Sequence, residues 1–234
     1  MEIKPIASSS AGNCYLISDG ETRLLIEAGI PIKDIKVATD FLDPKIDGCL
    51  ISHSHNDHAR SVNDLLALGV KCYMSAETYT ELGLQSPFID LIANEKAFNI
   101  NTFKILPLRL FHDVPCLGFY IMSKATKEAL FFATDTHFIP YQFKNLDYIM
   151  VEANYDANIV DRKIEAGCYD SVAKDRLVKS HMDITTTIQW LEGQNLKGCK
   201  RIYLLHLSNS SSDEADFKQR VIEATGVPCT VCPA

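Results

Sequence analysis

The chain has 234 residues, of which 47% are hydrophobic and 23% are charged, and its formal net charge is −7. This is the composition of a globular protein with a sizeable core, and no apolar run reaches the roughly 20 residues that a membrane span needs. The acidic balance argues against tight, non-specific binding of long nucleic acid through a basic face, although bound metal cations would offset negative charge inside a site.

The first half of the chain alternates short apolar segments with amphipathic ones. Apolar runs bounded by turn residues predict strands at 3–7, 14–19, 22–29, 48–55 and 71–75. Helical spacing of apolar residues predicts helices at 30–42, 59–70 and 76–84.

The second half continues this pattern. One or two strands are expected in 98–112, and further strands at 117–123, 129–136, 146–154, 199–210 and 228–232. Helical material is expected over 171–193, broken near His181, and over 213–225. With no repeat and no linker, residues 1–234 are interpreted as one α/β domain with two sheets and flanking helices.

Eight cysteines are scattered through the chain, and two of them, Cys229 and Cys232, form a CxxC near the C-terminus. The N-terminal residues lack the basic start and apolar stretch of a signal peptide. Scattered thiols without an export signal are typical of buried cysteines in a reducing compartment. We therefore expect a soluble, cytoplasmic protein.

One stretch concentrates metal-capable side chains: His53, His55, Asp57 and His58 form an HxHxDH pattern. In an extended strand His53 and His55 point the same way, so both can reach one ion, while Asp57 and His58 follow and can turn toward a second. Imidazole and carboxylate suit zinc, manganese or iron. Catalytic zinc usually has three protein ligands, so two ions need further ligands from elsewhere.

Three further candidates lie where predicted strands end: His112, Asp135 and His206. Each one alone is more typical of an ordinary structural residue. Together with HxHxDH, and in this order, they favour a metal site.

The order of these residues resembles the metallo-β-lactamase superfamily. The resemblance implies a four-layer αββα sandwich with two metal ions at one edge of the sheets. It implies that the first ion is held by His53, His55 and His112. It implies that Asp57, His58 and His206 hold the second ion, and that Asp135 bridges both.

Several stretches, among them "SSSAGNCYLI", "ISHSHNDHARSV" and "LHLSNSSS", are similar to the YycJ/WalJ type within this superfamily. Members of this type resemble nucleases that act on single-stranded DNA from the five-prime end. The chain departs from the pattern at His137, where glycine is usual, and at Cys14, where serine is usual. His137 is expected to face solvent, with contact to the substrate as the alternative.

Glu152 and His181 resemble a glutamate–histidine pair that lies near the metals in related phosphodiesterases. A histidine polarised by a glutamate can donate a proton to the leaving oxygen. Asp57, His181 and Glu152 are therefore the residues expected to take part in catalysis.

The sequence thus predicts a metal-dependent hydrolase with two divalent ions, in first place a phosphodiesterase or nuclease for single-stranded DNA. The interval between Asp135 and His206 is too short for the capping domain of β-CASP nucleases, and no tRNA-binding arm is visible between His112 and Asp135. A small-molecule hydrolase for cyclic phosphodiesters, thioesters or lactones is the main alternative. A di-iron redox protein and an inactive binding module rank below it.

Overall fold

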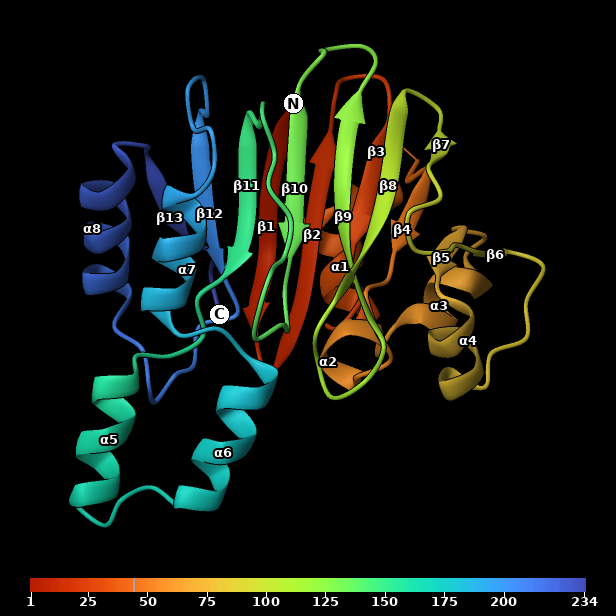
Figure 1. Cartoon of the computed structure of the whole chain (residues 1–234). Helices are drawn as coiled ribbons and strands as arrows, with labels where there is room; N and C mark the ends of the chain where they lie inside the picture. Colours follow the sequence, from red (N-terminus) through yellow and green to blue (C-terminus); the bar gives the residue numbers. More distant parts are fainter. Residues whose placement is uncertain (44) are drawn as a thin grey trace.

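The computed structural model describes residues 1–43 and 45–234, and its strands form two sheets that lie face to face (Figure 1). The first sheet has the order β1-β2-β3-β4-β5-β6, with β1 (Glu2–Ser9), β2 (Gly12–Ser18), β3 (Arg23–Ile26), β4 (Gly48–Leu50), β5 (Cys72–Met74) and β6 (Ile89–Leu91). The second has the order β13-β12-β11-β10-β9-β8-β7, with β7 (Phe98–Ile100), β8 (Phe103–Leu110), β9 (Cys116–Ser123), β10 (Ala129–Ala133), β11 (Tyr148–Glu152), β12 (Arg201–Leu205) and β13 (Cys229–Val231).

Helices cover the outer faces of both sheets. Those that follow strands of the first sheet are α1 (Ile32–Ala38), the 3₁₀ turn η1 (Asp40–Leu42), α2 (Asn56–Ala59), α3 (Val62–Ala67) and α4 (Ala76–Leu82). The second half contributes α5 (Ala157–Glu165), α6 (Ser171–Ser180), α7 (Ile184–Glu192) and α8 (Glu214–Thr225). In Figure 1, α7 and α8 flank β12 and β13, whereas α5 and α6 extend beyond the ends of the strands.

Apolar residues fill the spaces between these layers. Neighbouring residues of a strand point to opposite faces, so Phe131 packs toward Phe217 of α8 while Phe132 packs between the sheets, 5.4 Å from the ring centroid of Tyr15. A third cluster, which includes Leu25 and Leu65, joins the first sheet to its helices. Three apolar clusters between four structural layers confirm the predicted αββα sandwich.

Three predicted elements have different bounds in the structure. β4 ends at Leu50, so the expected strand 48–55 is wrong beyond that residue. The helix expected at 59–70 is confirmed only over α3, Val62–Ala67, and the short helix α2, which ends at Ala59, was not predicted. The helix expected at 30–42 stops after Ala38, because the three residues of η1 have positive φ angles that an α-helix cannot contain.

Residues 153–195 contain one helix that the sequence did not predict, α5, and two that it did, α6 and α7. The expected break near His181 is confirmed, since α6 ends at Ser180 and α7 begins at Ile184, where Asp183 caps it by accepting the backbone N–H of Thr185. Helix α5 was not predicted, and neither was strand β6. Val160 of α5 is buried and Ile164 is half-buried four positions later, so its sequence does carry a helical pattern, although over only nine residues.

Two predictions drawn from composition can be compared with the structure. All eight cysteines lie in the described residues and carry free thiols, six of them buried. No helix within residues 1–43 or 45–234 is long and apolar enough to cross a bilayer. The cytoplasmic location and the single domain over 1–234 stay predictions.

Candidate metal centre

The metal-capable side chains gather where strand ends meet at one edge of the sandwich. Strands β8, β10, β11 and β12 run in the same direction, because β9 is antiparallel to both of its neighbours and β10 to β12 are parallel. Their carboxyl ends therefore lie at one edge. They carry His112 after β8, Asp135 after β10, Glu152 at the end of β11 and His206 after β12.

The HxHxDH segment reaches the same edge from β4 of the other sheet. His53 and His55 lie in the loop after β4, and not in a strand as expected, yet their ring centroids are only 4.7 Å apart. His55 is the N-cap residue of α2, the short helix that carries Asp57 and His58. The turn into this helix brings the ring of His58 back toward His53, with the two ring centroids 4.2 Å apart.

The seven predicted ligands form two groups that share Asp135. Within each group the candidate ligand atoms lie within 4.8 Å of one another. The first group is His53, His55, His112 and Asp135, and the second is Asp57, His58, Asp135 and His206. These are the two ligand sets that the resemblance implies, with the implied bridging residue common to both.

Asp135 lies at the centre of these contacts. Its Oδ2 is 3.7 Å from Nε2 of His53, 3.3 Å from Nε2 of His58 and 3.7 Å from Nε2 of His112. Its Oδ1 is 3.4 Å from Nδ1 of His206. One buried carboxylate therefore faces imidazoles of both groups.

The donor atoms fit divalent metal ions. Nε2 of His53 is fully buried and has no hydrogen-bond partner among the described residues, while its Nδ1 lies 2.8 Å from the Ser52 hydroxyl. An orphaned imidazole nitrogen in a buried cluster costs free energy unless it has a ligand to bind. Imidazole and carboxylate donors suit zinc, manganese or iron.

Charge pairing holds the carboxylates of the cluster ionised. Burial opposes the charged form of Asp57, but hydrogen bonds from His206 and His58 hold its pKa well below the usual value. Burial also disfavours the charged form of His53. Together with the charge of the neighbouring His58, it lowers the pKa of this imidazole well below its usual value. His53 is therefore a neutral imidazole at pH 7, which is the form that binds a metal.

Glu152 and His181 form a close pair beside the second group. Nδ1 of His181 lies 2.5 Å from Oε1 of the fully buried Glu152. The other oxygen of Glu152 accepts backbone N–H groups of Thr136 at 3.0 Å and Met182 at 3.4 Å. Burial works against the charged form of His181, but Glu152 outweighs it and raises the pKa of this imidazole. The structure thus brings together the two side chains that the sequence paired.

Four residues at the site were not predicted. Oε1 of the buried Glu27 lies 3.6 Å from Nδ1 of His58, and Asn13 Nδ2 lies 3.1 Å from Nε2 of the same ring. Asn154 Nδ2 is 3.1 Å from His206 Nδ1, and Asp113 Oδ1 is 3.0 Å from His112 Nε2. The buried strand end "LLIEAG" was the one signal in the sequence, since a glutamate there has no water to face.

A cavity of about 430 Å³ opens onto this edge. Its wall combines residues of both metal-capable groups with one face of α6. It is lined by Ser10, His55, Asp57, His112, Asp113, Asp135, Tyr169, Ala173, Arg176, Leu177, Ser180, His181 and His206.

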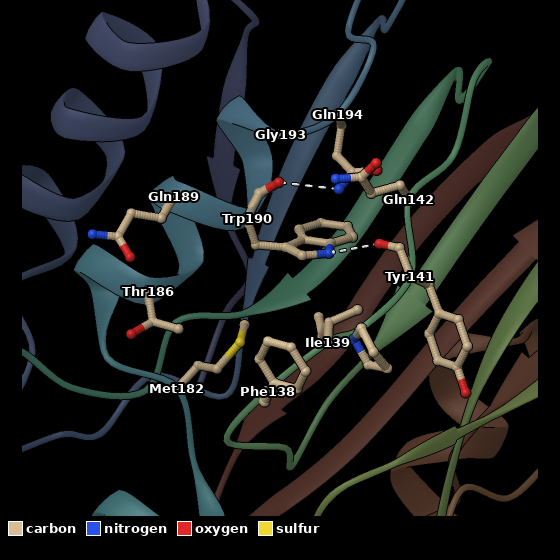
Figure 2. Close-up of a pocket in the computed structure, with 11 residues that line it drawn as sticks. Phe138, Ile139, Tyr141, Gln142, Met182, Thr186, Gln189, Trp190, Gly193 and Gln194 are labelled. Carbon is tan, nitrogen blue, oxygen red and sulfur yellow. Dashed lines mark hydrogen bonds between the residues drawn. The ribbon is translucent and has the colours of Figure 1, made fainter.

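A second cavity, of about 320 Å³, lies between α7 and the loop that follows β10 (Figure 2). Trp190 packs against this loop and donates its indole N–H to the carbonyl of Tyr141 at 3.0 Å. Phe138 and Met182 lie at the other end of this cavity, each one residue away from His137 or His181. His137 itself is exposed, as expected, with its ring centroid 5.9 Å from that of Phe111.

Comparisons with known proteins agree with this geometry. The model of the family described as "Beta-lactamase superfamily domain" matches residues 22–207. The chain is 25% identical over 224 residues to exodeoxyribonuclease WalJ of Streptococcus pneumoniae, covering 88% of this chain and 81% of that protein.

Solved structures with the same fold cover nearly the whole chain. The metallo-β-lactamase fold protein YhfI from Bacillus subtilis has a TM-score of 0.74 at 15% identity, covering 99% of this chain and 96% of YhfI. A diphosphatase from the PhnP family has a TM-score of 0.69 at 14% identity, with 97% and 94% covered, and the short form of human tRNase Z has 0.65 at 15%, with 100% and 96% covered. With its family match, its fold and its clusters able to hold divalent metals, the chain belongs to the β-lactamase superfamily, the hydrolases of the metallo-β-lactamase fold.

Proposed function

We propose that this hydrolase is a metal-dependent phosphodiesterase that cleaves single-stranded DNA. The observation that carries the proposal is the convergence of six buried or half-buried ligand side chains around Asp135, with the Glu152–His181 pair beside them. The similarity to a protein named as an exodeoxyribonuclease supports nucleic acid as the substrate.

Two divalent ions, zinc, manganese or iron, are assigned to the two groups of side chains. His53, His55 and His112 would hold the first, Asp57, His58 and His206 would hold the second, and Asp135, which belongs to both groups, would contribute to each. Such ions would supply a nucleophilic water of lowered pKa and neutralise the charge that builds on the phosphate oxygens.

Side chains of the protein orient the attacking water and protonate the leaving oxygen. The attacking water loses one proton to solvent, and Asp57, ionised because of its low pKa, accepts a hydrogen bond from the remaining O–H and directs the oxygen lone pair toward phosphorus. His181, kept protonated by Glu152, donates its proton to the oxygen of the leaving alkoxide. Glu152 then stabilises and orients the ring that moves the proton.

Cleavage of an end-labelled single-stranded oligonucleotide by purified protein, with manganese or zinc, tests this function. Asp57→Ala is expected to abolish cleavage and to lower the bound metal content, because one ligand and one orienting carboxylate are lost together. Asp64→Ala is the matched control, since Asp64 is an exposed aspartate on the neighbouring helix α3. Equal cleavage by both variants, or none by the wild type, would contradict the proposal.

A small-molecule hydrolase on the same two ions is the second candidate. The net charge of −7 and the exposed carboxylate of Asp113 at the cavity favour a smaller and less charged substrate than DNA. Hydrolysis of bis(p-nitrophenyl) phosphate without DNA cleavage would favour a small phosphodiester. Failure on both substrates with two metals bound would favour thioesters or lactones.

A further inference from the structure

Helix α6 presents one face to the cavity of the metal centre. Its cavity-lining residues are Ala173, Arg176, Leu177 and Ser180, spaced by three, four and seven positions from the first, which is the spacing of one helical face. The carbonyl of Ser180 lies 3.0 Å from Nδ1 of His112, so the end of this face is joined to the predicted ligands.

Burial in the core does not account for the position of α6. None of its residues is buried, and Val172 and Val178 are 64% and 45% exposed. Figure 1 shows the α5–α6 segment projecting past the strand ends. There α6 supplies residues to the lining of the cavity and none to the buried core. An element that contributes so few buried contacts suggests a role at the cavity itself.

Arg176 is the positively charged residue on the face of α6 that lines the cavity. Among the described residues that line the cavity it is the one arginine or lysine, and it faces a site that contains the carboxylates of Asp57, Asp113 and Asp135. Within residues 1–43 and 45–234 no ion pair engages its guanidinium, whereas Lys174 on the same helix is paired with Asp161. A guanidinium beside a catalytic cavity, without a carboxylate partner, matches the shape and charge of a phosphate group.

Resting on the nuclease function proposed above, we propose that Arg176 binds a phosphate of the substrate strand other than the one being cleaved. The scissile phosphate has the metal-capable groups as its partners. A neighbouring phosphate would otherwise face acidic side chains, and Arg176 supplies the positive charge that holds it. The residue thereby favours an oligonucleotide over an isolated phosphodiester.

The test compares Arg176→Gln with Lys179→Gln in the metal-loaded protein. Lys179 is an exposed cation on the same helix that does not line the cavity, so its variant removes the same net charge. The ratio of kcat/KM for a single-stranded oligonucleotide to that for bis(p-nitrophenyl) phosphate is expected to fall about tenfold to a hundredfold in Arg176→Gln. The ratio for Lys179→Gln should stay near that of the wild type, and Arg176→Lys should recover part of the loss.

Binding provides a readout that does not depend on turnover. The affinity for a phosphorothioate oligonucleotide, which resists cleavage, is measured by fluorescence anisotropy at several salt concentrations. Loss of one phosphate contact lowers the slope of log affinity against log salt by about 0.7 for a single strand. A purely structural role of Arg176 would leave this slope unchanged.

The outcomes separate the two proposals. If the wild type cleaves the oligonucleotide and Arg176→Gln changes neither the ratio nor the slope, the inference is overturned and the nuclease function stands. If the wild type hydrolyses bis(p-nitrophenyl) phosphate alone, both are overturned. Oligonucleotides with and without a terminal phosphate identify the source of the bound group. A loss confined to the phosphorylated strand assigns Arg176 to the end of the chain, and an equal loss assigns it to an internal linkage.

Discussion

Asp135 and His206 have φ angles of 49° and 52°, in a region that few residues other than glycine occupy. His206 follows the last residue of β12 and Asp135 lies two residues after the end of β10, and the left-handed conformation turns the chain sharply at each point. Such conformations cost about 1–3 kcal/mol and persist where the surroundings enforce them. At both residues, the backbone has this costly conformation and the side chain faces the other predicted ligands.

Glu152 acts through His181 and is therefore a positioning residue. Glu152→Gln is expected to lower kcat for an oligonucleotide about a hundredfold with little change in KM, because the amide cannot hold His181 as an imidazolium. Hydrolysis of bis(p-nitrophenyl) phosphate should fall much less, since p-nitrophenolate leaves without being protonated.

Steady-state kinetics on both substrates check this prediction, with Glu192→Gln as the control at an exposed glutamate of α7. An equal loss on the two substrates would mean that Glu152 supports the fold of the site and not proton transfer.

At the scale of elements, the site depends on the close approach of α2 to the segment after β3. A β-carbon on Gly29 would lie 1.6 Å from the carbonyl oxygen of Asp57, far inside van der Waals contact. The backbone N–H of Ala28 donates to the carbonyl of His58 at 2.8 Å, so the two segments are also hydrogen-bonded. Glycine is therefore required here by the close approach, and not by an unusual φ angle.

Gly29→Ala is accordingly expected to push α2 out of place, to destabilise the protein by about 1–3 kcal/mol and to weaken metal binding. Chemical denaturation and competition with a metal-chelating dye measure the two effects. Gly193→Ala is the matched control, because the added methyl group would meet its nearest atom at 3.4 Å. Unchanged metal affinity in Gly29→Ala would show that α2 tolerates displacement.

What the sequence could predict differs between elements for physical reasons. The strand-end residues were visible because the parallel strands β10 to β12 each contain an apolar run that ends in a polar residue, at Thr134, Glu152 and His206. Glu27 was not assigned, because its partner His58 lies on another segment and their contact depends on how β3 pairs with β4. Helix α5 was not predicted because the helical spacing of Val160 and Ile164 spans only nine residues with a single buried side chain, and so short a pattern does not distinguish a helix from irregular structure.

At the scale of the whole molecule, the metal centre joins the two halves of the sandwich. His53 and His58 follow a strand of the first sheet, whereas Asp135 and His206 follow strands of the second. Their side chains meet at one edge of the space between the two sheets. The apolar residues of the intersheet core fill the rest of that space. Ions bound by residues of both halves would therefore add to the free energy of unfolding.

Metal removal is expected to lower the denaturation midpoint. At a free metal concentration a hundred times the dissociation constant, binding to the folded state alone contributes about 2.7 kcal/mol. Thermal unfolding with and without a chelator measures the shift. Asp135→Asn should reduce it strongly, because that carboxylate contacts both groups, and Asp64→Asn should leave it as in the wild type. A shift of equal size in all three proteins would place the stabilising ions elsewhere.

Trp190, whose indole closes one side of the cavity in Figure 2, is the only tryptophan in the chain. Its ring lies 5.6 Å from that of Phe131 in β10, and its N–H is bound to the loop that leads from β10 to β11. Fluorescence excited selectively in the indole ring therefore comes from a single residue of known position. The emission spectrum of the unlabelled protein reports whether α7 remains seated against the second sheet, so that docking of this helix can be timed during refolding without an added dye.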